Sequence, residues 1–345
     1  MIMKAKLFCM LLCAGALCSC EPDESVEMPV DIPTENPDTD GGSENPGGSD
    51  GNNEGTDEKP DKPVKGEEIG IYNIKLNDEI MAIVGSSKWI DICWGNGIYV
   101  AVKTVTYGGS ESLGCAVSSN GVDWEIVKSS NLFYDIKRIC FANGKFVAVG
   151  KSTHWYGPTS VSTDGRIWNI SNLNDKDVDL NCICYGNGKF VAGSNNSVYL
   201  SSDGLNWTEK SLGLGIVYNI IYGKNIFVGT SNNSNIMYFS TDGENWEKIE
   251  LKNKYRNVCY GNGKFLAVGN TLTVATSSDG KSWDEIVPSV PNDGHIVPTR
   301  ILYIQGYFIS LQQSAKLIYM SKDGINWSGP IKFDKYVNSM CGIFN

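Results

Sequence analysis

The arginines beyond residue 67 offer the clearest capacity for ligand chemistry, and there are four of them. Arg138, Arg256 and Arg300 each stand near the start of a recurring apolar run, so their guanidinium groups could together bind an anionic group through bidentate hydrogen bonds. Arg166 lies in a turn motif and is not expected to reach a ligand. The alternative is structural: the three arginines satisfy backbone carbonyls and the carboxylate of Asp91.

Histidine and cysteine chemistry is not predicted. The chain has two histidines, His154 and His295, too few for a histidine-based metal site or catalytic group. Cys182 and Cys184 share one face of a predicted strand, but neither histidine nor a second cysteine pair stands near them in sequence. We therefore interpret the cysteines beyond residue 67 as small buried apolar residues, and expect no metal and no cofactor.

Three aromatic residues stand in variable loops, where no repeated pattern requires them. Tyr107, Trp155 and Tyr156 could offer flat apolar faces to sugar rings or to protein side chains. The alternative is that these rings pack over neighbouring loops. The candidate ligand-binding residues are therefore Tyr107, Trp155, Tyr156, Arg138, Arg256 and Arg300.

One phrase recurs six times and predicts the elements that position these side chains. Its first half is ICWGNGIYVAV (92–102), ICFANGKFVAV (139–149), ICYGNGKFVAG (183–193), IIYGKNIFVGT (220–230), VCYGNGKFLAV (258–268) and ILYIQGYFISL (301–311). Its second half is SSNGVDW, STDGRIW, SSDGLNW, STDGENW, SSDGKSW and SKDGINW, ending at Trp124, Trp168, Trp207, Trp246, Trp283 and Trp327. Successive tryptophans are 44, 39, 39, 37 and 44 residues apart, a spacing typical of propeller blades.

Each unit divides into four short strands separated by Asn-Gly or Asp-Gly turns, without helical periodicity. Such units cannot bury both faces alone, so they must stack around an axis, which predicts an all-β propeller of four-stranded antiparallel blades. The stretch 337–341 repeats the start of an inner strand, and residues 69–86 precede the first full unit. We expect seven blades, the last completed by both termini; six blades are the alternative.

The repeated S-x-D-G-x-x-W phrase resembles the Asp-box of sialidase-like, or BNR-repeat, propellers, in a form one residue shorter. The resemblance covers 68–345 and implies that the boxes hold turns away from the ligand face, a structural role for Asp164, Asp203, Asp242, Asp279 and Asp323. A sialidase also needs an arginine triad, a Tyr nucleophile paired with Glu, and an Asp acid or base. No RIP-like motif precedes the first blade and no Tyr–Glu pair can be assigned, so catalytic residues are not predicted.

The N-terminal 67 residues have a different composition from the remainder. Residues 1–20 carry Lys4 and Lys6, an apolar run and the ending Leu-Cys-Ser-Cys, which is typical of a secretory signal and resembles a bacterial lipobox with Cys20 as the lipid-bearing residue. Ordinary secretion without a lipid is the alternative. Residues 21–67 have 15 acidic residues against three lysines and almost no large apolar side chain, which predicts a disordered acidic tether.

The distribution of charge along the chain limits the classes of binding partner that we expect. The whole chain has a formal charge of −10, which the tether and the signal account for, so residues 68–345 are near neutral. This balance argues against nucleic acid. We expect a monomeric lipoprotein of the cell envelope, anchored in the outer membrane and exposed at the surface, whose propeller binds a glycan or an envelope protein. A divergent sialidase-like glycoside hydrolase and a structural or assembly factor are the alternatives.

Overall fold

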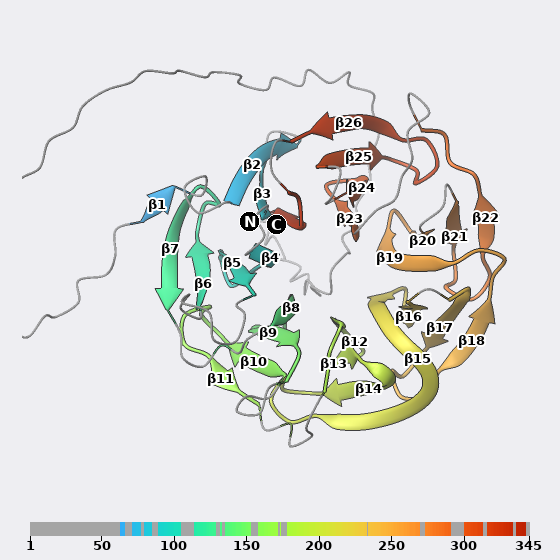
Figure 1. Cartoon of the computed structure of the whole chain (residues 1–345), viewed down its shortest axis with the longest axis horizontal. Coiled ribbons are helices and arrows are strands. Elements are labelled where there is room, and N and C mark those ends of the chain that lie inside the picture. Colours follow the sequence, from blue (N-terminus) through green and yellow to red (C-terminus); the bar gives the residue numbers. More distant parts are fainter. Residues whose placement is uncertain are drawn as a thin grey trace, which may run out of the picture. The chain divides into compact units, whose positions relative to one another are not determined.

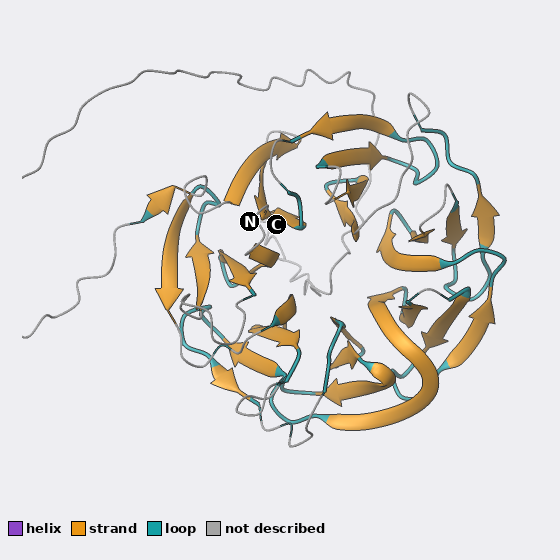
Figure 2. Cartoon of the chain, viewed as in Figure 1, coloured by secondary structure: helices purple, strands orange, loops and turns teal. Residues whose placement is uncertain are grey.

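The described part of the chain is a seven-bladed β-propeller (Figures 1 and 2). The computed structural model describes residues 63–65, 71–76, 79–84, 89–104, 114–128, 132, 135–152, 158–171, 173, 178–232, 234–269, 273–290, 300–312, 316–333 and 336–342. The regular elements within these ranges are β-strands, and among the described residues no helix is long and apolar enough to cross a membrane. The prediction of an all-β propeller with seven blades is confirmed.

Blades 1 to 3 follow the chain from the inner strand outward. Blade 1 contains β4 (Trp89–Gly95), β5 (Ile98–Lys103), β6 (Gly114–Ser118) and β7 (Asp123–Lys128). Blade 2 contains β8 (Ile136–Ala142), β9 (Lys145–Gly150), β10 (Thr159–Ser162) and β11 (Asn169–Ile170). Blade 3 contains β12 (Cys182–Gly186), β13 (Lys189–Gly193), β14 (Asn195–Ser201) and the beginning of β15 (Thr208–Gly223).

Blades 4 to 6 repeat this order. The long strand β15 is shared, because its second part is the inner strand of blade 4 and pairs with β16 (Ile226–Ser231), followed by β17 (Ile236–Ser240) and β18 (Glu247–Glu250). Blade 5 contains β19 (Tyr255–Gly261), β20 (Lys264–Gly269), β21 (Val274–Ser277) and β22 (Asp284–Ile286). Blade 6 contains β23 (Arg300–Ile304), β24 (Tyr307–Gln312), β25 (Leu317–Ser321) and β26 (Ser328–Lys332).

Blade 7 closes the ring with strands from both ends of the sequence. Its inner strand β27 (Ser339–Gly342) pairs with β3 (Glu79–Val84), which pairs with β2 (Ile71–Leu76). Among the described residues this blade has three strands rather than four. The strand β1 (Val64–Lys65) pairs instead with β7, as a fifth strand on blade 1, although it belongs to the segment 21–67 interpreted as tether. The chain therefore contributes to blade 1 on both sides of its blade 7 strands: β1 precedes β2 and pairs with the outer strand β7, and β3 is followed by the inner strand β4.

The apolar core lies in layers between neighbouring blades. The second strand of a blade is covered on both faces, so its side chains are almost all apolar; in β9, every residue from Phe146 to Gly150 is buried. In blades 1 to 6 an aromatic residue on the inner strand contacts one on the second strand, as Tyr260 and Phe265 do with ring centroids 4.6 Å apart. A Cβ on Gly95 would lie 2.1 Å from the Phe141 ring of the next blade, which explains the glycine in this phrase.

The six S-x-D/N-G-x-x-W turns join the third and fourth strands of blades 1 to 6. In the blade 3 turn, Asp203 Oδ1 accepts the N–H groups of Leu205 and Asn206 at 2.8 Å, and Trp207 Nε1 donates to the Gly204 carbonyl at 2.9 Å. The equivalent Asp164, Asp242, Asp279 and Asp323 each accept the same two backbone hydrogen bonds. Antiparallel pairing places these turns at the opposite end of each blade from the start of the inner strand.

Candidate functional site at the channel mouth

Seven structurally equivalent residues surround the channel where the inner strands begin. Each occupies the same register opposite the second strand of its blade. We call this set the mouth ring; its members are Asp91, Arg138, Cys182, Asn219, Asn257, Arg300 and Ser339. The mouth ring is polar at six of its seven positions, whereas the strands around it are mainly apolar. The starts of the inner strands are therefore where this propeller places side chains that can bind a ligand.

A cavity of about 60 Å³ opens among these strands. Its walls combine charged and amide side chains of the mouth ring with the thiols and aliphatic groups of the next residues along each strand. The residues that line it include Asp91, Arg138, Asn219, Asn257, Arg300 and Cys184. Because a buried water needs about 10–15 Å³, the cavity has room for on the order of four to six water-sized groups.

Asp91 is the fully buried carboxylate of the cavity, with 0% of its side chain exposed. Its Oδ1 accepts the Ile92 N–H at 2.9 Å and forms an ion pair with Arg300 Nη1 at 2.5 Å. Its Oδ2 accepts the N–H of Ile139 in the next blade at 3.2 Å. A buried carboxylate is tolerated when it is paired and hydrogen-bonded in this way. Asp91 therefore joins blade 1 to blades 2 and 6.

Arg138 lies close enough to Asp91 and Arg300 to interact with both electrostatically. Burial and then the positive charge of Arg300 lower the pKa of Arg138 from its usual value, while Asp91 acts in the opposite direction. The Arg138 Nη1 donates to the Lys137 carbonyl at 2.7 Å. Its charge is thus only partly balanced by the buried carboxylate.

Amide side chains at the mouth connect neighbouring blades. Asn219 Oδ1 accepts the Val258 N–H of the next blade at 3.2 Å, the counterpart in blade 4 of the bond from Ile139 to Asp91. Just before the mouth-ring residues in sequence, Lys137 Nζ forms an ion pair with Asp179 and donates to Asn181 Oδ1 at 2.9 Å. Asn219, Lys137 and Asn181 were not predicted as site residues, although all seven mouth-ring residues lie two positions before the column of the repeat that contains the recurring cysteine.

The predicted arginines do not all meet in the structure. Arg138 and Arg300 line the same cavity, whereas Arg256 is not among the lining residues. The Arg256 guanidinium stacks over the Tyr218 ring at 4.1 Å, and its buried Nε has no hydrogen-bond partner among the described residues. Arg166 pairs with Glu125 at 2.7 Å beside its turn, away from the channel mouth.

Several predicted residues lie outside the described part of the chain: Cys20, Tyr107, His154, Trp155, Tyr156 and His295. Asp164, Asp203, Asp242, Asp279 and Asp323 are described and lie in the turns at the other end of the blades. Among the described residues no group of three or more His, Cys, Asp or Glu side chains is arranged to hold a metal ion. Burial raises the pKa of Cys182 to about 12, so its thiol is protonated at neutral pH.

Comparison with known proteins identifies the architecture. Residues 124–259 match the model of the DUF6242 beta propeller domain. No curated protein matches the chain in sequence. Among solved structures, the chain is similar to a streptogramin B lyase, with a TM-score of 0.60 and 12% identity over 76% of this chain and 87% of that one.

Two further solved structures have the same fold. The virginiamycin B lyase from Staphylococcus aureus has a TM-score of 0.60 and 12% identity over 76% of this chain and 88% of that chain. YCF48 bound to D1 peptide has a TM-score of 0.53 and 15% identity over 75% and 85%. At these identities the likeness concerns the fold alone. The chain is a β-propeller protein whose residues 124–259 resemble the DUF6242 propeller domain.

Proposed function

We propose that this protein is a non-catalytic binding propeller of the cell envelope, which recognises a glycan or an envelope protein on the face where the inner strands begin. The observation that carries the proposal is the mouth ring, where Arg138, Arg300, Asn219 and Asn257 line a cavity at the channel. Binding sites typically combine a concave surface with a few convergent polar groups, and this cavity has both.

The described residues of the cavity favour binding over glycoside hydrolysis. Hydrolysis of a glycosidic bond generally requires two carboxyl groups, about 5–10 Å apart, on either side of the bond. Asp91 is the carboxylate among the lining residues, and hydrogen bonds and the ion pair with Arg300 occupy both of its oxygens. A carboxylate in this state serves to position Arg300 rather than to accept a proton from a substrate.

Proteins with similar folds include both enzymes and binding proteins. The solved structures that resemble this chain include lyases and a propeller bound to a peptide, so the fold does not decide between them and the site must. The mouth ring supports the binding alternative. Tyr107, Trp155 and Tyr156 lie in sequence between the second and third strands of blades 1 and 2, and the proposal assigns their rings to the same contact surface.

The N-terminal segment would place this surface outside the cell. In the proposal Cys20 carries the lipid, and the acidic residues between Cys20 and β1 form a self-repelling spacer, whose root-mean-square length is roughly 40 Å for a flexible coil. Lipidation can be tested by metabolic labelling with a clickable fatty acid. A Cys20→Ala variant should lose the label and leave the membrane fraction; continued labelling would contradict the assignment of Cys20.

A glycan array tests the binding function. The full chain, the double variant Trp155→Ala/Tyr156→Ala and the control Ile167→Ala would be compared, with a fluorogenic sialoside assay beside them. Ile167 is 71% exposed in the blade 2 turn, far from the channel mouth, so its variant should bind like the parent. Loss of binding in the double variant without turnover supports the proposal. Turnover would contradict it, and absence of binding would exclude the sampled glycans and leave the protein partner.

A further inference from the structure

The cavity at the mouth ring has unused hydrogen-bond donors. A guanidinium has five N–H donors. Within the described part of the chain, Arg138 directs one donor, on Nη1, to the Lys137 carbonyl, and Arg300 directs one, also on Nη1, to Asp91. Asp91 accepts its hydrogen bonds from Ile92, Ile139 and Arg300, and it shares none with Arg138 in the described part of the chain. The remaining guanidinium donors can bind an acceptor that enters the cavity.

The lining of the cavity is also positively charged overall. It contains two arginines and one carboxylate, while its amides are neutral and burial keeps the thiol of Cys184 protonated by raising its pKa. The repulsion between Arg138 and Arg300 contributes to the lowered pKa of Arg138, and Asp91 does not cancel this effect. An anion between the two guanidinium groups would remove the repulsion and accept their free donors.

The size of the cavity limits what can enter. About 60 Å³ accommodates a group of a few heavy atoms, such as a carboxylate, but not a sugar ring. A sugar acid carries its carboxylate directly on a ring that is larger than this volume. An Asp or Glu side chain, or the carboxyl end of a peptide, carries its carboxylate on a narrow chain. This chain can enter the cavity behind the carboxylate.

We propose that Arg138 and Arg300 form a binding site for a peptide carboxylate, with Asp91 holding Arg300 in position. This inference rests on the proposed binding function and makes it more specific: the partner is a protein segment that presents one carboxylate to the channel mouth. Arg256, stacked on Tyr218 beside the mouth, adds positive charge that attracts acidic segments.

The test follows the arginine Nε–Hε resonances of the full chain during titration with two matched peptides. N-acetyl-Gly-Asp-Gly-amide carries one carboxylate, and N-acetyl-Gly-Asn-Gly-amide replaces it with an amide of similar shape. At constant ionic strength, the Asp peptide should shift the Arg138 and Arg300 resonances saturably, and the Asn peptide should not. Equal shifts with both peptides, or no saturable shift with the Asp peptide, would overturn the proposal.

Variants locate the site. Arg138→Gln should weaken binding of the Asp peptide at least tenfold, because it removes one of the two guanidinium groups. Arg166→Gln removes an arginine from a distant turn and should leave the affinity unchanged. Arg300→Gln would leave Asp91 buried without its cation, so Arg138→Gln, whose replacement leaves that ion pair intact, is the decisive variant. Unchanged affinity in Arg138→Gln would contradict the assignment.

Further ligands separate failure of this inference from failure of the proposed function. N-acetylneuraminic acid, titrated in the same way, tests the sugar carboxylate; saturable shifts with this acid but not with the peptide would overturn the peptide as ligand. If the array detects a glycan while Arg138 and Arg300 stay unshifted by all three probes, the binding function stands and the carboxylate site is wrong. If neither experiment detects binding, both proposals lose their support.

Discussion

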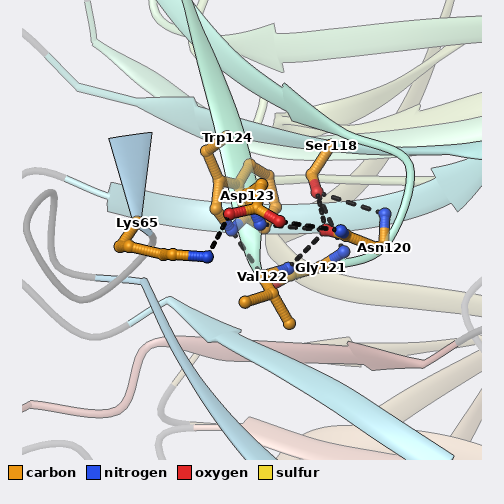
Figure 3. Close-up of polar contacts among 7 residues, drawn as sticks. All are labelled: Lys65, Ser118, Asn120, Gly121, Val122, Asp123 and Trp124. Atoms are coloured by element: carbon orange, nitrogen blue, oxygen red, sulfur yellow. Dashed lines mark hydrogen bonds and ion pairs between the residues drawn. The ribbon is translucent and has the colours of Figure 1, made fainter. Parts of the chain in front are cut away.

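Asn120 and Asp123 form in blade 1 the side-chain hydrogen bond that Asp203 and Asn206 form in blade 3, with amide and carboxylate exchanged. Asn120 Nδ2 donates to Asp123 Oδ2 at 3.0 Å, and Asn206 Nδ2 donates to Asp203 Oδ2 at 2.8 Å. The exchange keeps the turn intact and moves the carboxylate to the strand beside it. Figure 3 shows Lys65 of β1 reaching this carboxylate, with Nζ 2.5 Å from Asp123 Oδ1.

The ion pair between Lys65 and Asp123 should control how firmly β1 is attached to blade 1. Hydrogen bonds from Lys65 and Asn120 lower the pKa of Asp123, so this contribution to stability is present above the ordinary carboxyl pKa and is lost as the pH falls through the lowered one. In Lys65→Gln the pKa of Asp123 should rise, and the Val64 amide should exchange faster. Carboxyl ¹³C shifts and hydrogen exchange measure both effects. Lys128→Gln, on the same blade, is the control; an unchanged Asp123 pKa in Lys65→Gln would refute the assignment.

The turn aspartates should make the protein sensitive to acid. Backbone N–H groups of Ser282 and Lys281 hold the pKa of Asp279 at about 2, below the usual value of 3.8. Asp279 has a lower pKa in the folded protein than in the unfolded chain. Its contribution to the stability of the fold is therefore complete above about pH 4 and is lost between about pH 4 and pH 2. Asp279→Asn should lose less stability over this range, because Asn120 shows that an amide oxygen accepts the same backbone bonds. Urea unfolding at pH 7 and pH 3 tests this, and equal losses for both proteins would argue against it.

Two glycines with the same backbone conformation should respond differently to alanine. Gly144 and Gly165 have φ of 71° and 70°, so alanine is strained at both, by about 1 kcal/mol. A Cβ at Gly144 meets nothing within 4 Å, whereas one at Gly165 would lie 2.6 Å from Val100 Cγ2 of the preceding blade. Gly165→Ala should therefore cost about 1–3 kcal/mol more than Gly144→Ala. Denaturant unfolding of the two variants measures the difference; similar losses would show that the blades adjust to the added methyl group.

The ion pair between Arg300 and Asp91 should show strong coupling in a double-mutant cycle. Arg300→Gln leaves a fully buried carboxylate without its cation and should destabilise the fold by about 3–5 kcal/mol. Adding Asp91→Asn removes the unpaired charge, so the double variant should be more stable than Arg300→Gln alone. Additive losses would indicate that the two groups do not interact in the folded protein.

The buried thiols should be unreactive until the propeller unfolds. Burial raises the pKa of Cys115 and that of Cys182 to about 12, and the thiolate is the form that reacts. Iodoacetamide at pH 8 should leave both unmodified in the native protein and label them in urea, as peptide mapping would show. Cys93, which is partly exposed, serves as the reference position. Rapid native labelling of Cys115 or Cys182 would contradict the described packing.

The architecture could be predicted because each blade repeats the same local signals. Alternating apolar residues, a tight Asn-Gly or Asp-Gly turn and the tryptophan after it recur six times, and Cys341 on a seventh inner strand indicated where the ring closes. Strand β1 was not predicted, because Val64 and Lys65 are two residues in an acidic, proline-rich stretch. Their pairing with Asp123 and Trp124 depends on a blade that lies almost sixty residues away in the chain.

The site was predictable only in part. The positions of Arg138, Arg256 and Arg300 near the starts of strands followed from the repeat, but their partners did not. Asp91 and Arg300 are 209 residues apart and belong to blades separated by the closing blade. Only the closed ring, which sets the rotation between successive blades, brings them into contact, leaves Arg138 beside them and directs Arg256 to Tyr218. The sequence alone determined the blade and its repetition, because turn chemistry and alternation are local. The tertiary structure decided which charges meet, because packing around the channel is not local.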